Sequence, residues 1–137
     1  MTKTTFARAV SAAVLGAGLT MAALPAFAAH IEARFGNTML GIRPDGTILK
    51  LYYNKDHTFS GLITPAGSPT SFEAKGTWKL KGEKLCVTPE GAGADGKPAK
   101  ESCAVLKGDK VGDKWQTTVQ GTDGKPVVQS VEIVKGR

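Results

Sequence analysis

The sequence has 137 residues, of which 18 are lysine or arginine and 12 are aspartate or glutamate, so the formal net charge is +6. The lysines are spread singly, as in Lys75, Lys79 and Lys84, which is typical of the solvated faces of strands. Nucleic-acid-binding proteins instead carry a clustered basic stripe with aromatic residues between the charges. Length and charge pattern therefore argue against a nucleic-acid partner and for one small domain.

The first 28 residues have the three parts of a secretory signal peptide. Lys3 and Arg8 form a positive amino-terminal region, and residues 9–24 form an apolar run that is too short to anchor stably in a bilayer. Ala26-Phe27-Ala28 follows, with small residues at the two positions that signal peptidase inspects. We therefore expect residues 1–28 to be removed by cleavage after Ala28, with cleavage after Ala29 as the second choice.

Removal of the signal peptide determines the charge and the expected location of the mature chain. Without Lys3 and Arg8, residues 29–137 carry a net charge of +4. We expect this segment to form a single domain in the periplasm or in the secreted fraction, as a monomer with no membrane span.

Alternating apolar and polar residues, interrupted by turn sequences, run through the mature chain and predict β-strands. In the clearest strand, residues 70–80, Phe72 and Trp78 alternate with Glu73 and Lys79. Gly-, Pro- and Asp-rich turn sequences separate the strands. The strands expected in chain order cover residues 34–40, 47–53, 57–63, 70–80, 85–87, 104–106, 111–119 and 127–133.

Strands with one apolar and one polar face, joined by short connections, are typical of antiparallel up-and-down sheets. Such a sheet must close on itself or cover its edges. We therefore expect an all-β fold, a small lipocalin-like β-barrel of seven or eight strands, with an open β-sandwich as the alternative. Gly76, in the longest strand, suits a bend at a barrel corner.

The two cysteines, Cys86 and Cys103, both lie in the mature chain and form no Cys-x-x-Cys pair. An even pair in a small exported domain predicts a disulfide bond, and two free buried thiols are the alternative. A bond closing a loop of about 17 residues would stabilise the fold by roughly 3 kcal/mol.

No set of residues in the sequence predicts catalysis, a cofactor or a metal site. Asp45, Asp56 and Asp123 lie in turn sequences, where aspartate bonds its own backbone. His30 and His57 would suit copper only if cleavage followed Ala29. We therefore predict a non-enzymatic protein without a cofactor.

Four aromatic residues at expected inward positions, Tyr53, Phe72, Trp78 and Trp115, have two interpretations. They form the core, or they line the mouth of a barrel that holds a small apolar ligand. Tyr52 faces outward in the predicted pattern and is our candidate for a protein contact. Residues 29–34 and 91–100 are the segments that an inhibitory protein would present to its target.

Several short motifs carry a resemblance to known proteins. They are Phe35-Gly36-Asn37-Thr38, Asp56-His57-Thr58-Phe59, Gly76-Thr77-Trp78, Leu85-Cys86, Val111-Gly112-Asp113-Lys114-Trp115 and Gly136-Arg137. This set resembles uncharacterised small exported β-barrel proteins of Gram-negative bacteria. Its hairpin pattern is similar to that of lipocalin-like barrels and of small periplasmic barrels that inhibit proteases or lysozyme. The Ser-Gly-Ala-x-Tyr loop of the lysozyme inhibitors is absent from the sequence.

Because a fold does not determine a function, the resemblance leaves the function open. We expect an exported, non-enzymatic protein that binds a small apolar ligand in its barrel. The alternatives are an inhibitor of a secreted or periplasmic hydrolase, acting through an exposed loop, and an envelope protein without a discrete site.

Overall fold

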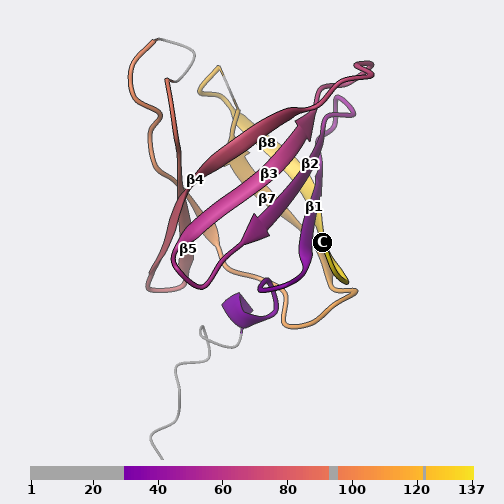
Figure 1. Ribbon diagram of the computed structural model, residues 1–137, viewed down its shortest axis with the longest axis vertical. Coiled ribbons are helices and arrows are strands. Elements are labelled where there is room, and N and C mark those ends of the chain that lie inside the picture. Colours follow the sequence, from indigo (N-terminus) through magenta and orange to yellow (C-terminus); the bar gives the residue numbers. More distant parts are fainter. Residues whose placement is uncertain (1–29, 93–95, 122) are drawn as a thin grey trace, which may run out of the picture.

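The computed structural model describes residues 30–92, 96–121 and 123–137, so the predicted signal peptide lies outside the described residues. Within those three segments, no helix is long and apolar enough to cross a membrane. A short helical turn at residues 30–32 precedes eight antiparallel strands (Figure 1). The strands are β1 (Thr38–Ile42), β2 (Ile48–Tyr53), β3 (Thr58–Thr64), β4 (Phe72–Lys81), β5 (Lys84–Pro89), β6 (Ser102–Val105), β7 (Lys114–Gln120) and β8 (Pro126–Val134).

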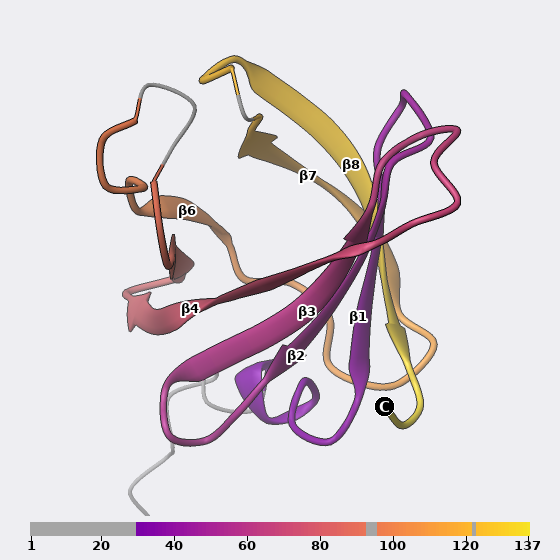
Figure 2. The same cartoon turned by 45° about the horizontal axis from the view of Figure 1, so that its top comes forward.

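The strands form one sheet in the order β6-β5-β4-β3-β2-β1-β8-β7, which curls into a barrel (Figure 2). β1 pairs with β2 on one side and with β8 on the other, so that Met39 lies opposite both Leu51 and Ile133. β6 and β7 lie beside each other as the two ends of the sheet, but they form no ladder. The fold is therefore a nearly closed up-and-down barrel, which confirms the predicted all-β meander over the open sandwich.

Aspartates hold three of the hairpin turns. In each, Oδ1 accepts a hydrogen bond from the backbone N–H two residues further on, at 2.8 Å for Asp45 and at 3.0 Å for both Asp56 and Asp123. Such bonds allow the chain to reverse direction without further support. The regular turn signals of the sequence therefore set the ends of the strands.

Gly76 lies where two elements approach β4 closely. A Cβ atom added there would lie 2.2 Å from the backbone oxygen of Thr88 and 2.6 Å from Phe59 Cε1. No side chain fits at this position, because the Phe59 ring lies directly over the glycine. This is the close approach that a glycine inside a strand indicates.

The hydrophobic core gathers at one end of the barrel, which we call the closed end because residues 30–35 cover it (Figure 1). Strand ends and the helical turn contribute to it together. Its buried members are Ile31, Met39, Tyr53, Phe59, Trp78, Leu85, Leu106, Val131 and Ile133.

Three residues expected in the interior differ from the prediction. Phe72 is 52% exposed, because β5 pairs with β4 only from Gly76 onward and leaves the first residues of β4 uncovered on that side. Val111 is exposed because it lies in the connection before β7 rather than in a strand. Trp115 is only half-buried, whereas Trp78 is buried as predicted.

Cys86 of β5 and Cys103 of β6 are direct cross-strand neighbours with a Cα–Cα distance of 4.0 Å, and they form the predicted disulfide bond. β6 has only four residues and lies at an end of the sheet. The bond therefore fastens a short edge strand to the body of the barrel.

Candidate ligand-binding cavity

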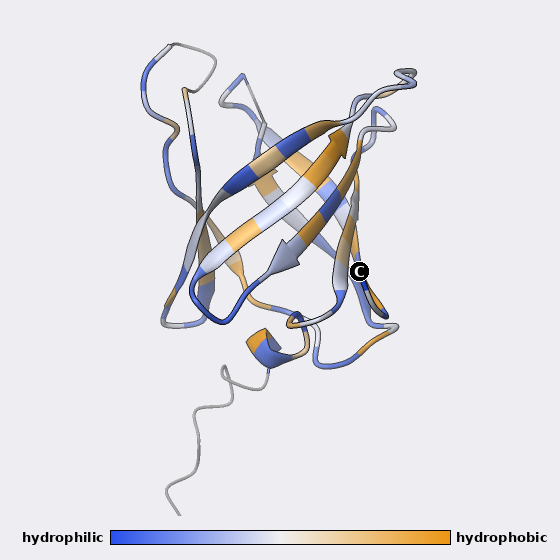
Figure 3. Cartoon of the chain, in the orientation of Figure 1, coloured by the Kyte–Doolittle hydropathy of each residue, from blue (hydrophilic) through white to orange (hydrophobic). Residues whose placement is uncertain are grey.

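The barrel encloses a cavity of about 260 Å³ that all eight strands line. The lining begins at Arg34, near the closed end. At the other end of the barrel it reaches Arg43, which follows β1, and Pro89, the last residue of β5. Along the strands, apolar residues alternate with polar ones (Figure 3). The larger aliphatic side chains of the lining are Met39, Leu49, Leu51, Ile63, Leu85 and Leu106.

Small residues on three strands leave space for this cavity. Gly41 of β1, Ala74 of β4 and Ala104 of β6 all belong to the lining. A Cβ atom added at Gly41 would meet Leu49 and Gln129 at 3.5–3.7 Å, which is ordinary contact. Unlike Gly76, Gly41 could therefore carry a side chain directed at the cavity wall.

The structure separates the four aromatic residues that were predicted to touch a ligand. Tyr53 and Trp115 line the cavity, while Phe72 and Trp78 are not among its lining residues. Phe72 lies exposed at the start of β4. Only Tyr53 and Trp115 therefore remain candidates for ligand contact.

Trp78 belongs to the structural core at the closed end. Its indole N–H donates a hydrogen bond of 2.9 Å to the backbone oxygen of Asn54, and the His57 ring stacks on it at 4.3 Å. The rings of Phe35 and Tyr53 contact it at centroid distances of 5.9 Å and 6.4 Å. These contacts show that the indole belongs to the core that closes this end of the barrel.

Arg34 is a buried cation at the closed end of the cavity, with 3% of its surface exposed. Its Nη1 and Nη2 donate hydrogen bonds of 2.8 Å to the backbone oxygens of His30 and Lys107. The guanidinium carbon lies 5.5 Å from the centroid of the Trp115 ring, within cation–π range. Burial lowers the pKa of Arg34, but an arginine remains charged in proteins.

Tyr53 lines the same cavity as Arg34 and carries a neutral hydroxyl. Burial raises the pKa of Tyr53, and the nearby positive charge of Arg34 opposes that shift to a smaller extent. The phenol therefore stays protonated at neutral pH and can donate a hydrogen bond.

Sequence reasoning missed the polar residues of the lining. Arg34 Nε, Arg43 Nε and Gln129 Oε1 are buried and have no hydrogen-bond partner in the described part of the chain. For Gln129 the signal was present, because it lies between Val127 and Val131 on the inward face of the last strand. Arg34 gave no such signal, because its burial depends on Lys107, which is 73 residues away.

The features proposed for a protein contact are less exposed than the sequence indicated. Tyr52 is half-buried, and the Arg137 guanidinium lies over its ring at 5.7 Å. Residues 30–34 do not form a free arm, since Ile31 and Arg34 are buried against the barrel. Of the 91–100 segment, residues 93–95 lie outside the described residues.

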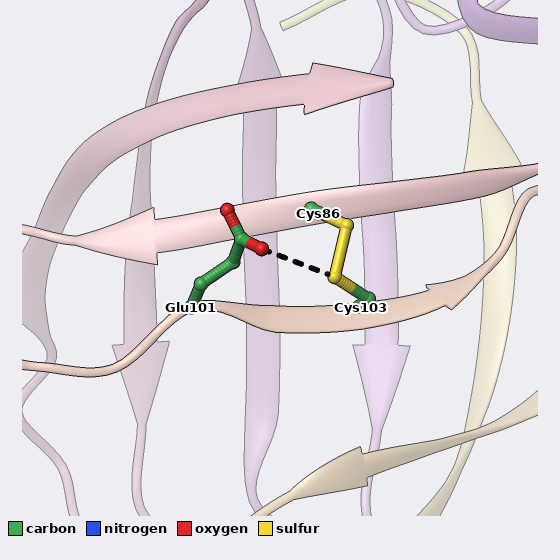
Figure 4. Close-up of side chains that lie close together, drawn as sticks. All are labelled: Cys86, Glu101 and Cys103. Atoms are coloured by element: carbon green, nitrogen blue, oxygen red, sulfur yellow. Dashed lines mark hydrogen bonds between the residues drawn. A yellow bond between two sulfur atoms is a disulfide. The ribbon is translucent and has the colours of Figure 1, made fainter. Parts of the chain in front are cut away.

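Cys86, Cys103 and Glu101 lie close together (Figure 4). Both sulfurs belong to the disulfide, so neither can bind a metal as a thiolate. For the same reason the 3.5 Å approach of Cys103 Sγ to Glu101 Oε1 is a contact without a donated proton. Glu101 instead pairs with Lys79 and Lys81. The group is therefore a salt-bridge cluster beside the disulfide.

The two histidines each have a structural contact. His30 Nδ1 meets the carboxylate of Asp109, and His57 stacks on Trp78.

Comparison of this chain with protein-family models, with curated proteins and with solved structures gave no match.

Proposed function

We propose that this protein is an exported, non-enzymatic binding protein that holds a small apolar ligand in its barrel. The observation that carries the proposal is the cavity of about 260 Å³ with its largely aliphatic and aromatic wall. Apolar surface gains free energy when a ligand removes it from water. Barrels of eight strands are wide enough to hold one small molecule.

The volume limits the size of that molecule. About 260 Å³ lies just below the range of roughly 300–1,000 Å³ that is usual for pockets holding drug-sized ligands. The ligand we propose is accordingly a single aromatic ring with a short chain, or an alkyl chain of medium length.

The chemistry of the lining supports binding rather than catalysis. Among the described residues, those that surround the cavity include no histidine, aspartate, glutamate or cysteine. General acid–base catalysis needs a group that titrates near the working pH and reaches the substrate. Arg34 and Tyr53 do not meet that need, because one stays charged and the other stays neutral at that pH.

Export is supported by the predicted signal peptide and by the disulfide bond, since disulfides persist in oxidising compartments. We place the protein in the periplasm or in the secreted fraction on this basis. The resemblance of its hairpins to lipocalin-like barrels agrees with a carrier.

The test is a titration of the protein, purified after export, with decanol, toluene and butylbenzene. Binding is followed by calorimetry and by tryptophan emission, because Trp115 lines the cavity. We expect saturable binding of at least one compound with a change in emission. The variant Gly41→Leu places a side chain in the cavity and should abolish that binding.

The matched control is Lys50→Leu, which adds the same side chain at an exposed position on the neighbouring strand β2. It should bind as the unmodified protein does. Silence across all three compounds, with the fold intact by circular dichroism, would overturn the carrier proposal. A protein partner would then be the better candidate.

A further inference from the structure

We propose that the ligand is a small amphiphilic carboxylate, whose acid group is held by Arg34 and Tyr53 and whose apolar part fills the cavity toward the opposite end. This inference rests on the proposed function, because it specifies the chemical class of the ligand for the same cavity. Three observations support it: an uncompensated buried charge, a lining without acidic residues, and a hydroxyl that can donate to a group in the cavity.

The first observation is the charge of Arg34. No carboxylate forms an ion pair with this residue anywhere in the described segments. A guanidinium has five N–H donors, and the two hydrogen bonds that Arg34 donates go to neutral backbone oxygens. A buried charge without a counter-charge is strongly unfavourable. An anion in the adjoining cavity would compensate it.

The second observation is the sign of the field in the cavity. The charged residues of the lining are Arg34 and Arg43, and both are cations. Arg43 is half-buried and lies close to Asp45; a backbone hydrogen bond from Thr47 is the main cause of the lowered pKa of that carboxyl, and Arg43 adds to it. Arg43 is thus partly exposed to water, which screens its charge, whereas Arg34 is only 3% exposed. An anion should therefore bind at the closed end of the cavity, next to Arg34.

The third observation is the position of Tyr53. Its side chain lines the cavity and is 6% exposed. No hydrogen bond among the described residues involves its hydroxyl, so the hydroxyl can donate to a group in the cavity. A carboxylate can accept from a guanidinium and a phenol together. Arg34 and Tyr53 line the same cavity.

The test compares three ligands with the same alkyl chain: decanoate, decanol and decyltrimethylammonium. Each is titrated into the protein by calorimetry below the concentration at which it forms micelles. We expect decanoate to bind at least about tenfold more tightly than decanol, from one charge-assisted hydrogen bond. The cationic ligand should bind most weakly.

The variant Arg34→Gln keeps hydrogen-bond donors but removes the charge. Within this variant, decanoate should bind no more tightly than decanol, so that the ratio of the two affinities falls to about one. Lys50→Gln removes one positive charge from the outer face of β2 and should leave the preference for decanoate intact.

A measurement on the unmodified protein covers the case in which Arg34→Gln fails to fold. The preference for decanoate should disappear at a pH low enough to protonate its carboxylate, while decanol binding stays constant. In Tyr53→Phe the preference should fall but not vanish.

Each remaining outcome counts against the inference. Equal binding of decanoate and decanol would overturn it and leave the proposed function standing. A preference that survives in Arg34→Gln would overturn the role of Arg34. Absence of binding by all three ligands would overturn the inference, and the proposed function would then be decided by the aromatic compounds of the first titration.

Discussion

The imidazole of His57 lies flat on the indole of Trp78, with 4.3 Å between the ring centroids and 11° between the ring planes. His57 is also the only non-glycine residue with a positive φ, 68°, in the described part of the chain. Glycine is the usual residue in that conformation, because it has no Cβ to clash. The stacking contact therefore explains why a hairpin turn retains histidine at a position that favours glycine.

Substitution of His57 should separate these two effects. His57→Ala loses the ring contact and keeps the unfavourable φ, while His57→Gly loses the contact and relieves the φ. We expect His57→Ala to lower the free energy of unfolding more than His57→Gly does, by about 1 kcal/mol. Urea unfolding of both variants measures the difference. Equal stabilities would show that the backbone at residue 57 is unstrained.

Two strand glycines should respond in opposite ways to the same substitution. In Gly76→Ala the new Cβ would meet the Thr88 oxygen at 2.2 Å, whereas in Gly41→Ala its nearest neighbour is at 3.5 Å. We expect Gly76→Ala to destabilise the protein by more than about 1 kcal/mol, from overpacking. Gly41→Ala should raise stability by about 0.5–1 kcal/mol, because it reduces the entropy of the unfolded chain. Thermal and urea unfolding of the two variants provide the comparison, and a destabilised Gly41→Ala would contradict the account of open space at that position.

Strand number and order were predictable, because every strand has one face in the barrel interior and therefore alternates. The turn aspartates were predictable for a local reason, since each bonds a backbone N–H two residues away. The exposure of Phe72 was not predictable, because alternation indicates which face of a strand a residue lies on and not how far the neighbouring strand extends. β5 stops covering β4 at Gly76, and this depends on the lengths of both strands.

The site was less predictable than the fold. Tyr53 and Trp115 were found from alternation, but whether their surroundings are filled or hollow depends on side-chain sizes across all eight strands. Arg34 was missed because an isolated arginine at the start of the first expected strand is normally solvated. Its burial follows from contacts with the β6–β7 connection, which no local pattern encodes.

The disulfide should contribute a large share of the stability. Cys86 and Cys103 are 17 residues apart in sequence, so removing the bond should lower the free energy of unfolding by about 3 kcal/mol. The test compares the double variant Cys86→Ala/Cys103→Ala with the unmodified protein in the presence of a reductant, which serves as the control. Urea unfolding should give the same loss in both. A loss below about 1 kcal/mol would mean that β6 stays in place by its ladder with β5 alone.

Acid should destabilise the protein through three carboxylates, two exposed and one half-buried. A lowered pKa in the folded state is found for Asp45, for Asp56 and for Glu101. Hydrogen bonds from Thr47 and from Thr58 are the main causes for the two aspartates, and for Glu101 the main cause is a hydrogen bond from Lys81.

The direction of the effect follows from linkage. A carboxyl whose pKa is lower in the folded state stabilises the fold at any pH above its unfolded value, which is about 4 for these residues. That stabilisation is lost as the pH falls through the folded-state pKa, because the folded protein must then take up the proton. We therefore expect a melting temperature that is level above about pH 5 and decreases steadily as the pH falls below about 4.

Asp56 offers the clearest single test of this linkage. Its Oδ1 accepts hydrogen bonds from the N–H and the hydroxyl of Thr58, at 3.0 Å and 2.6 Å. Asp56→Asn keeps an acceptor but cannot titrate, so its melting temperature should decrease less steeply in acid than that of the unmodified protein. Thr58→Ala keeps the carboxyl but loses the hydroxyl that lowers its pKa, so it should also flatten the acid slope, at the expense of stability at neutral pH. Melting curves measured in half-unit steps from about pH 2 to pH 7 compare the three proteins, and parallel curves would show that Asp56 contributes nothing to acid unfolding.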